Sequence, residues 1–291
     1  MQQIKTISVG HSPDADDIFM YYAIKFGWIS IENTKFENIA LDIETLNQAT
    51  LKGVYDICAI SFALYPFVKD DFALLKTAVS FGEGYGPKLI KKKGAKLKRN
   101  FKVALSGEFT TNALLFKIAY PDARVTYMNF LDIENAVING DVDAGVLIHE
   151  SILTYSSVLE VEREIWDIWV ELCDGEELPL PLGGMCLRRS IPLNDAIKYE
   201  NALIKAVDVA NKNRKTLAVM LLEKGLIRVD APTLDKYLDL YANDNSVKLS
   251  EIQYKAIDKL FELGYKSGHY QNLLRSQDFT IPSEYKDLRN S

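Results

Sequence analysis

The strongest candidate for a catalytic residue in this sequence is a histidine that follows a predicted buried strand. The apolar segment Val146-Leu147-Ile148 ends abruptly in His149, Glu150 and Ser151. Ligands of open α/β sheets bind at the carboxyl ends of the strands, where an imidazole that titrates near neutral pH can act as a general base. The same histidine could instead cap a loop by hydrogen-bonding a carbonyl. The spacing alone leaves both interpretations open.

A second candidate site lies between a predicted strand and a predicted helix. The segment from Ser106 to Asn112 contains Gly107 and the pair Thr110-Thr111. Free amides at a helix N-terminus, together with two hydroxyl groups, are suited to bind an anion. Thr110 and Thr111 are therefore candidate ligand-binding residues, although ordinary capping of the helix would need only one of them.

Hydroxyl and carboxyl groups also follow the first and third predicted strands. The segment from His11 to Asp17 includes Ser12 and Asp16, and Ser61 follows the third strand. Asp16 and Asp17 complement the dipole of the next helix, which is a sufficient role for one of them. Ser61 either lines the same cleft or caps a helix. These acidic residues lack a nearby pattern of Cys or His ligands, so we predict no metal site, and a Mg²⁺ site has no support.

The remaining motifs are weak or missing. Gly82-x-Gly84-x-Gly86 lacks the order of a dinucleotide fingerprint, and the sequence contains neither GxxxxGK[ST] nor GxSxG. The stretch from Lys88 to Lys102 carries many basic and no acidic residues. Such a run is most often a solvated face, and it can also steer an anionic substrate toward a cleft.

Strands and helices alternate along the part of the chain that would hold these side chains. Hydrophobic periodicity predicts strands at 4–10, 39–43, 56–60, 101–105, 124–128 and 144–148. It predicts helices at 18–26, 45–52, 61–68, 111–119 and 132–139, followed by C-terminal helices at 199–212, 216–224, 233–242 and 250–263. Ser250 and Gln253 form a predicted capping box. This alternation predicts an α/β fold with largely parallel sheets.

Two interruptions of the alternation suggest an inserted lobe. Glycine- or proline-rich segments lie near 85–95 and 180–190. We therefore expect residues 1–88 and 190–291 to form one lobe, which includes the helical C-terminal part, and residues 89–189 to form the other. A ligand would then bind in the cleft between the lobes.

Composition narrows the class of protein. The 291 residues are 48% hydrophobic and 25% charged, which is typical of a soluble globular protein, and the length suits one large domain or two lobes. A formal net charge of −6 argues against nucleic-acid binding. Three widely spaced cysteines, Cys58, Cys173 and Cys186, fit reduced thiols better than disulfides. We see neither a signal peptide nor a membrane span, so we expect a cytoplasmic protein.

Several segments together resemble one enzyme family. They are Ser12-Pro13-x-x-x-Asp17-x-Phe19, Glu44-Thr45-Leu46-Asn47, Thr110-Thr111, Ile148-His149-Glu150-Ser151 and Leu178-Pro179-Leu180-Pro181-Leu182-Gly183. In this order they resemble the 1,4-dihydroxy-6-naphthoate synthases, which belong to the futalosine pathway of menaquinone biosynthesis. His-Glu-Ser and Leu-Pro-Leu-Pro-Leu-Gly are the specific pieces.

The resemblance implies a fold and a reaction. The fold would be two-lobed and like that of type II periplasmic solute-binding proteins, with a cleft between the lobes. The reaction would be that of a cytoplasmic carbon–carbon lyase, which converts cyclic dehypoxanthine futalosine to 1,4-dihydroxy-6-naphthoate and releases dihydroxyacetone. No metal or organic cofactor is implied. The partner would be this small anionic substrate, with no nucleic acid or membrane, and the oligomeric state is left open.

The resemblance also implies roles for individual residues. The catalytic base falls on His149, and the substrate-binding segments fall on Ala59-Ile60-Ser61 and Thr110-Thr111. Ser12, Asp17 and Glu150 are further candidates. The chain departs from the family in two places, because Ala15-Asp16 replaces a Pro-Asn pair before the aspartate and Ala59 replaces a lysine.

Three other functions compete with this one. A solute-binding protein for a small anionic ligand would share the fold but would require export. The related chorismate dehydratase also resembles the chain, although the His-Glu-Ser segment favours the synthase. An effector domain of a transcription regulator is disfavoured, since no helix-turn-helix pattern precedes Ile4.

Overall fold

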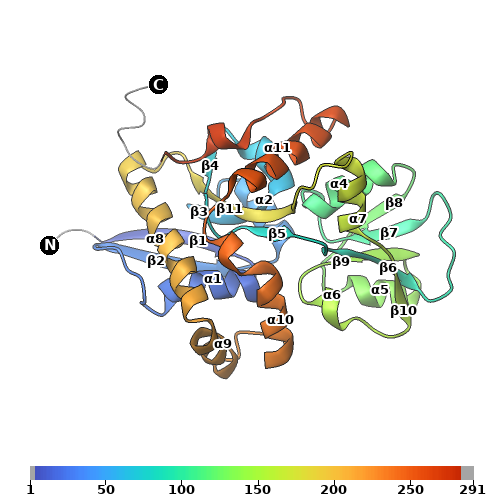
Figure 1. Cartoon of the computed structure of the whole chain (residues 1–291), viewed down its shortest axis with the longest axis horizontal. Helices are drawn as coiled ribbons and strands as arrows, with labels where there is room; N and C mark the ends of the chain where they lie inside the picture. The colour runs from blue at the N-terminus through green and yellow to red at the C-terminus, as the bar shows by residue number, and fades with distance from the viewer. Residues whose placement is uncertain (1–3, 283–291) are drawn as a thin grey trace.

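The computed structural model describes residues 4–282 and arranges them in two α/β lobes, which lie side by side in Figure 1. The sheet of the first lobe contains β1 (Lys5–His11), β2 (Thr34–Ala40), β3 (Ile57–Ser61), β4 (Phe72–Leu74), β5 (Ser80–Gly82) and β11 (Leu180–Arg188). The sheet of the second lobe contains β6 (Lys88–Lys92), β7 (Lys102–Leu105), β8 (Arg124–Tyr127), β9 (Ala144–Leu147) and β10 (Leu159–Glu164).

Both sheets combine parallel and antiparallel pairs. In the first sheet the order is β2-β1-β3-β11-β4, where β1 is parallel to β2 and β3, and β11 is antiparallel to β3, β4 and β5. In the second sheet the order is β10-β6-β9-β7-β8, and β7 is parallel to both β8 and β9. The parallel pairs place the carboxyl ends of β1 and β3, and of β7 and β9, at shared sheet edges. The predicted α/β fold is confirmed.

The helices cover the sheets. Those up to β11 are α1 (Ala15–Lys25), α2 (Ile43–Leu51), α3 (Tyr65–Val68), α4 (Thr111–Ala119), α5 (Ile133–Asn139), α6 (Ser151–Thr154) and α7 (Ile165–Leu172), with a 3₁₀ turn η1 (Phe62–Leu64). After β11 come α8 (Leu193–Lys212), α9 (Arg214–Glu223), α10 (Ala231–Tyr241), η2 (Asp244–Ser246), α11 (Glu251–Lys266) and η3 (Ser276–Phe279).

Apolar periodicity explains how the C-terminal helices attach to the first lobe. α8 buries Tyr199, Leu203 and Val207 at helical spacing and packs against α1. α11 begins at the predicted capping box, in which Gln253 accepts a hydrogen bond from the backbone amide of Ser250. It then packs against β11 and η1. In Figure 1 these helices surround the first sheet.

Two sequence predictions need correction. The strand predicted at 39–43 runs from 34 to 40, because Asp42 caps α2 by accepting a hydrogen bond from the amide of Thr45 at 3.1 Å. The basic stretch predicted as a solvated face includes β6, which lies between β9 and β10. Its residues Leu89 and Ile90 are fully buried, while Lys91 turns outward to glutamates on β10. The adjacent buried pair of this short strand could not be recognised among its lysines.

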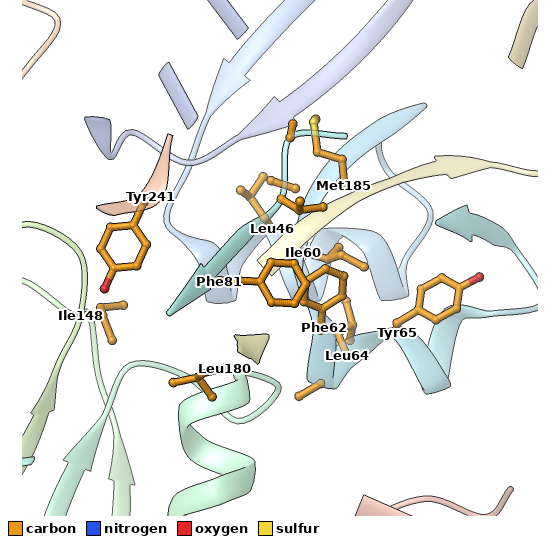
Figure 2. Close-up of a cluster of buried hydrophobic side chains, with 14 of the residues drawn as sticks. Leu46, Ile60, Phe62, Leu64, Tyr65, Phe81, Ile148, Leu180, Met185 and Tyr241 are labelled. Atoms are coloured by element: carbon orange, nitrogen blue, oxygen red, sulfur yellow. The ribbon is translucent and has the colours of Figure 1, made fainter. Parts of the chain in front are cut away.

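The division of the chain between the two sheets differs from the predicted lobes at one point. Residues 89–189 were assigned to one lobe, but β11 pairs only with strands of the first sheet among the described residues. The return crossing therefore precedes Leu180 instead of following it. Figure 2 shows a reason: Leu180 and Met185 of β11 belong to the same buried apolar cluster as Ile60, Phe62 and Phe81 of the first lobe. Across residues 4–282, no helix has the length and apolar character needed to cross a membrane.

Candidate active site

A pocket lies where the two lobes meet. Including the space that opens to solvent, it measures about 680 Å³. The segments after β1, β3, β7 and β9 contribute to its lining, as expected for the carboxyl ends of strands. Of the residues singled out in the sequence, the pocket is lined by Ser12, Asp17, Ala59, Ile60, Ser61, Thr110, Thr111 and His149. These candidates therefore share one pocket, while their individual roles remain predictions.

His149 is held in an unusual conformation at the end of β9. Its backbone φ is +54°, a left-handed value that few non-glycine residues adopt and that often marks a functional position. The ring lies edge-on to Phe130, with centroids 5.0 Å apart. Its Nδ1 lies 2.5 Å from Oδ2 of Asp14, while its Nε2 is buried and has no hydrogen-bond partner within residues 4–282. The free nitrogen is thus available to a ligand.

Asp14 and His149 stabilise each other's charge. Burial disfavours the imidazolium, but the charge of Asp14 and its hydrogen bond outweigh this effect and raise the pKa of His149 to about 9. Burial alone would raise the pKa of Asp14, yet the charge and hydrogen bond of His149 hold that pKa well below its usual range. The pair is therefore an ion pair at neutral pH in the protein without ligand.

Two further carboxyl groups surround this pair. Asp16 Oδ2 accepts a hydrogen bond of 2.7 Å from the hydroxyl of Ser80, and burial with the charges of Asp14 and Asp17 raises the pKa of Asp16 well above its usual value. Asp17 accepts a hydrogen bond of 2.7 Å from the amide of Ser12. Burial and the charge of Asp14 raise the pKa of Asp17 to about 7. The cluster therefore combines Asp14, which is ionised, with two carboxyl groups whose pKa is raised, those of Asp16 and Asp17.

Glu150 does not line the pocket but joins the two lobes beside it. Its Oε1 accepts a hydrogen bond of 2.9 Å from the amide of Ala15, the first residue of α1. Its Oε2 lies 3.4 Å from the guanidinium of Arg228, in the connection between α9 and α10. Arg228 also lies over the ring of Phe130, 5.3 Å from its centroid. Glu150 thus fastens the segment that carries Asp14 to the segment that carries His149.

The threonine pair has two different structural roles. Thr110 caps α4, because its hydroxyl accepts a hydrogen bond of 3.3 Å from the amide of Ala113. Thr111 crosses the cleft, because its hydroxyl donates a hydrogen bond of 3.0 Å to the carbonyl of Leu182 on β11. Both lie at the N-terminus of α4, where free amides favour a negatively charged ligand.

The lobes also touch near the end of β3. Ser61 is held by Asn47, whose side-chain oxygen accepts its amide hydrogen at 3.0 Å. On the same helix, Glu44 Oε2 accepts a hydrogen bond of 3.2 Å from the amide of Phe109 in the second lobe. Gly107 is needed at this contact, since a Cβ there would lie 2.2 Å from the Glu44 carboxylate. The hydrogen bond between the Phe109 amide and the Glu44 carboxylate therefore closes the pocket along this edge.

Sequence reasoning missed several residues of this pocket. Asp14 was part of the segment noted after β1, but its role could not be seen because its partner is distant in the chain. Tyr237 and Tyr241 of α10 line the pocket from the C-terminal helices, and no pattern distinguishes them from other core aromatics. In Figure 2, Tyr241 points its hydroxyl toward Ile148.

Asp14, Asp16 and His149 are also the side chains placed to hold a metal ion. Each offers one ligand atom, and these atoms lie within 4.8 Å of one another. However, Asp14 and His149 are already bonded to each other, and Mg²⁺ prefers six oxygen ligands. We therefore describe the group as an acid–base cluster.

Comparisons with known proteins find relatives that match most of the chain. Over 259 residues the chain is 29% identical to the 1,4-dihydroxy-6-naphthoate synthase of Streptomyces coelicolor, covering 87% of this chain and 90% of that protein. Over 268 residues it is 28% identical to the enzyme of the same name from Thermus thermophilus, covering 89% and 93%.

Solved structures extend the comparison to the fold. Protein AF1704 of Archaeoglobus fulgidus is 32% identical, with a TM-score of 0.83 over 91% of this chain and 98% of that one. The periplasmic aliphatic sulphonate-binding protein SsuA of Escherichia coli is 12% identical, with a TM-score of 0.65 over 95% and 97%. The likeness to SsuA shows the fold alone, and it confirms the predicted periplasmic-binding-protein-like architecture.

A sequence profile identifies the family. The profile described as menaquinone biosynthesis matches residues 7–266, which include both lobes and every pocket residue named above. Two relatives of the chain with assigned names are the synthases from Streptomyces and Thermus. The chain therefore belongs to the menaquinone biosynthesis family, in the group of the 1,4-dihydroxy-6-naphthoate synthases.

Proposed function

We propose that this protein is a carbon–carbon lyase that converts cyclic dehypoxanthine futalosine to 1,4-dihydroxy-6-naphthoate and dihydroxyacetone. The observation that carries the proposal is the free Nε2 of His149, buried in a pocket and supported through Nδ1 by Asp14. An imidazole fixed in this way by a carboxylate is suited to proton transfer. The names of the two similar synthases contain the product, 1,4-dihydroxy-6-naphthoate, and the resemblance of the sequence to that family implies the substrate.

The anionic substrate would bind through its carboxylate at the N-terminus of α4. Among the pocket-lining residues in the described part of the chain there is no lysine or arginine. The favourable positive potential for an anion therefore comes from the amides and hydroxyls near Thr110 and from the imidazolium of His149. This arrangement would place the rest of the substrate between the first turn of α4 and His149.

His149 in its neutral form would then act as the general base. It removes a proton from the substrate, the electrons of that bond form a new double bond, and the carbon–carbon bond to the departing three-carbon fragment breaks. The electron pair of the broken bond is protonated to release dihydroxyacetone, so no oxidant or reductant is needed. Contacts between the lobes exclude water from these steps. Because the pKa of His149 is about 9, the base form grows as the pH rises above neutrality.

The direct test is turnover. Purified protein is incubated with cyclic dehypoxanthine futalosine, and both products are measured by mass spectrometry, with His149→Gln as the matched control. We expect dihydroxynaphthoate and dihydroxyacetone in equal amounts from the wild type. Turnover of chorismate with loss of water would instead assign the related dehydratase activity. Binding of the substrate without turnover would support a solute-binding protein.

A further inference from the structure

The acid–base cluster contains two carboxylate oxygens that lack a partner. Oδ1 of Asp14 and Oδ1 of Asp16 are buried, and neither has a hydrogen-bond partner within residues 4–282. Both side chains belong to residues that are 3% exposed, so water does not readily compensate. Unsatisfied buried oxygens are rare and call for an explanation. Two neighbouring carboxylates can hydrogen-bond each other only if one of them carries a proton.

The neighbouring charges indicate which group carries that proton. Asp14 is paired with the imidazolium of His149, and Asp17 accepts an amide hydrogen bond that stabilises its charge. Asp16 receives only the hydroxyl of Ser80, while it faces the negative charges of both other aspartates. Like charges in such a buried cluster cannot all ionise. The proton therefore resides preferentially on Asp16.

Among the main influences on Asp16 from residues 4–282, His149 is the one positively charged group. The titratable and charged groups that act on Asp16 or are acted on by it are Asp14, Asp17, His149, Tyr85, Tyr237 and Tyr241. The tyrosines come from α10 and from the segment after β5. Arg228 reaches the edge of the cluster but is already paired with Glu150.

We propose that Asp16 is a neutral carboxylic acid and that its Oδ1–H donates a hydrogen bond to Oδ1 of Asp14, which forms a chain Asp16–Asp14–His149. A carboxylate oxygen from each aspartate and a ring nitrogen of His149 lie within 4.8 Å of one another. The bond fixes the rotation of the Asp14 carboxylate, and that carboxylate in turn fixes the ring of His149.

Asp16 is thus a positioning residue that acts through Asp14. The proton on Asp16 does not depend on the proposed function. Only the effect of Asp16 on turnover rests on that function. Asparagine can make the same contact, because its amide donates a hydrogen without carrying charge. The proposal therefore predicts that Asp16→Asn preserves the chain and Asp16→Ala breaks it.

Infrared spectroscopy tests the proton directly and needs no substrate. At about pH 8 most of Asp17, whose pKa is about 7, is ionised, whereas the proposal requires Asp16 to keep its proton. We expect a carbonyl band of a protonated carboxylic acid in the wild type, its loss in Asp16→Asn and its retention in the matched control Asp17→Asn. A spectrum in which Asp16→Asn changes no such band overturns the proposal.

The titration of His149 provides a second test without substrate. The chain has 3 histidines, so nuclear magnetic resonance can assign the His149 imidazole by comparison with His149→Gln. If Asp16 is neutral, Asp16→Asn removes no charge and leaves the pKa of His149 within about half a unit. If Asp16 is charged, the substitution lowers that pKa by about one unit or more, and the proposal is wrong.

Turnover completes the test. We expect Asp16→Ala to lower kcat about tenfold with a smaller change in KM, and Asp16→Asn to recover most of the loss. Equal impairment of the two variants contradicts the positioning role. A stoichiometric divalent metal in the purified protein that Asp16→Ala removes would also overturn the proposal. A wild type that shows the infrared band but no turnover rejects the proposed function and leaves the proton on Asp16 in place.

Discussion

Asp14 and His149 form an ion pair of 2.5 Å across the two lobes. Asp14 follows β1 of the first sheet, whereas His149 follows β9 of the second. Separation of the lobes would pull the pair apart, so the arrangement that supports proton transfer exists only when the cleft is closed. Glu150, the residue after His149, strengthens this dependence. Its carboxylate accepts a hydrogen bond from the amide of Ala15, the residue after Asp14.

Replacement of His149 separates a catalytic role from a structural one. We expect His149→Gln to lower kcat by about 10²–10⁴, the usual contribution of a positioned proton-transfer group. Asp14→Asn should lower kcat less, since the base remains but loses its support. If both residues act as one unit, the double variant will be no slower than His149→Gln. A double variant whose loss is the product of the single losses would show that they act independently.

The pH dependence of turnover should reflect the raised pKa of His149. Protonated His149 cannot accept a proton, so kcat/KM should rise with pH toward about 9 instead of levelling off near the ordinary imidazole value of 6.5. In Asp14→Asn the limb should move to lower pH, because burial without the compensating charge favours the neutral ring. An acidic limb that stays in place in Asp14→Asn would exclude this carboxylate as the cause.

Stability should depend on pH through the same pair. The pKa of His149 is higher in the folded than in the unfolded protein, so its contribution is complete below 6.5 and is lost as the pH rises through about 9. The pKa of Asp14 is lowered by folding, so its contribution is present above 3.8 and is lost as the pH falls. The contribution of this ion pair to the melting temperature should therefore be greatest between pH 3.8 and pH 6.5. Asp14→Asn should flatten the profile.

The two threonines should differ when they are replaced singly. Thr111→Val removes the hydrogen bond to Leu182 and the hydroxyl of a residue that lines the pocket, so we expect KM to rise. We expect the double variant with Thr110→Val to lose about 1–3 kcal/mol of substrate binding. Thr110→Val alone should cost about 1 kcal/mol of stability, because it removes the cap of α4. Thr110→Ser, which keeps the cap, is the control. An unchanged KM in the double variant would leave these residues as structural only.

Arg228 should affect closure more than chemistry. Arg228→Ala removes the ion pair with Glu150 and the contact with Phe130, both of which cross the cleft. We expect KM to rise by a factor of about 2–5, in keeping with a pair that is partly exposed, with little change in kcat. Small-angle scattering should show a larger average radius for this variant. The same scattering curve as the wild type would argue against a role in closure.

The sequence by itself determined the local features of this site. Apolar runs placed Ser61, Thr110 and His149 at strand ends or helix starts, because burial and capping depend on neighbours a few residues apart. The same logic predicted α4 within its observed bounds and the capping box of α11. This reasoning did not predict β6, because its lysines are typical of a solvated face. It did not predict β11 either, because that strand lies in a proline- and glycine-rich segment.

Only the tertiary structure decided which of these local features act together. Asp14 and His149 are 135 positions apart in the chain, and each lies in a segment whose own pattern explains it as a cap or a loop residue. Their contact and the charge of the pair arise from packing one lobe against the other. Burial removes water from the carboxylates. Because they are desolvated, the distances between these groups determine which of them is charged.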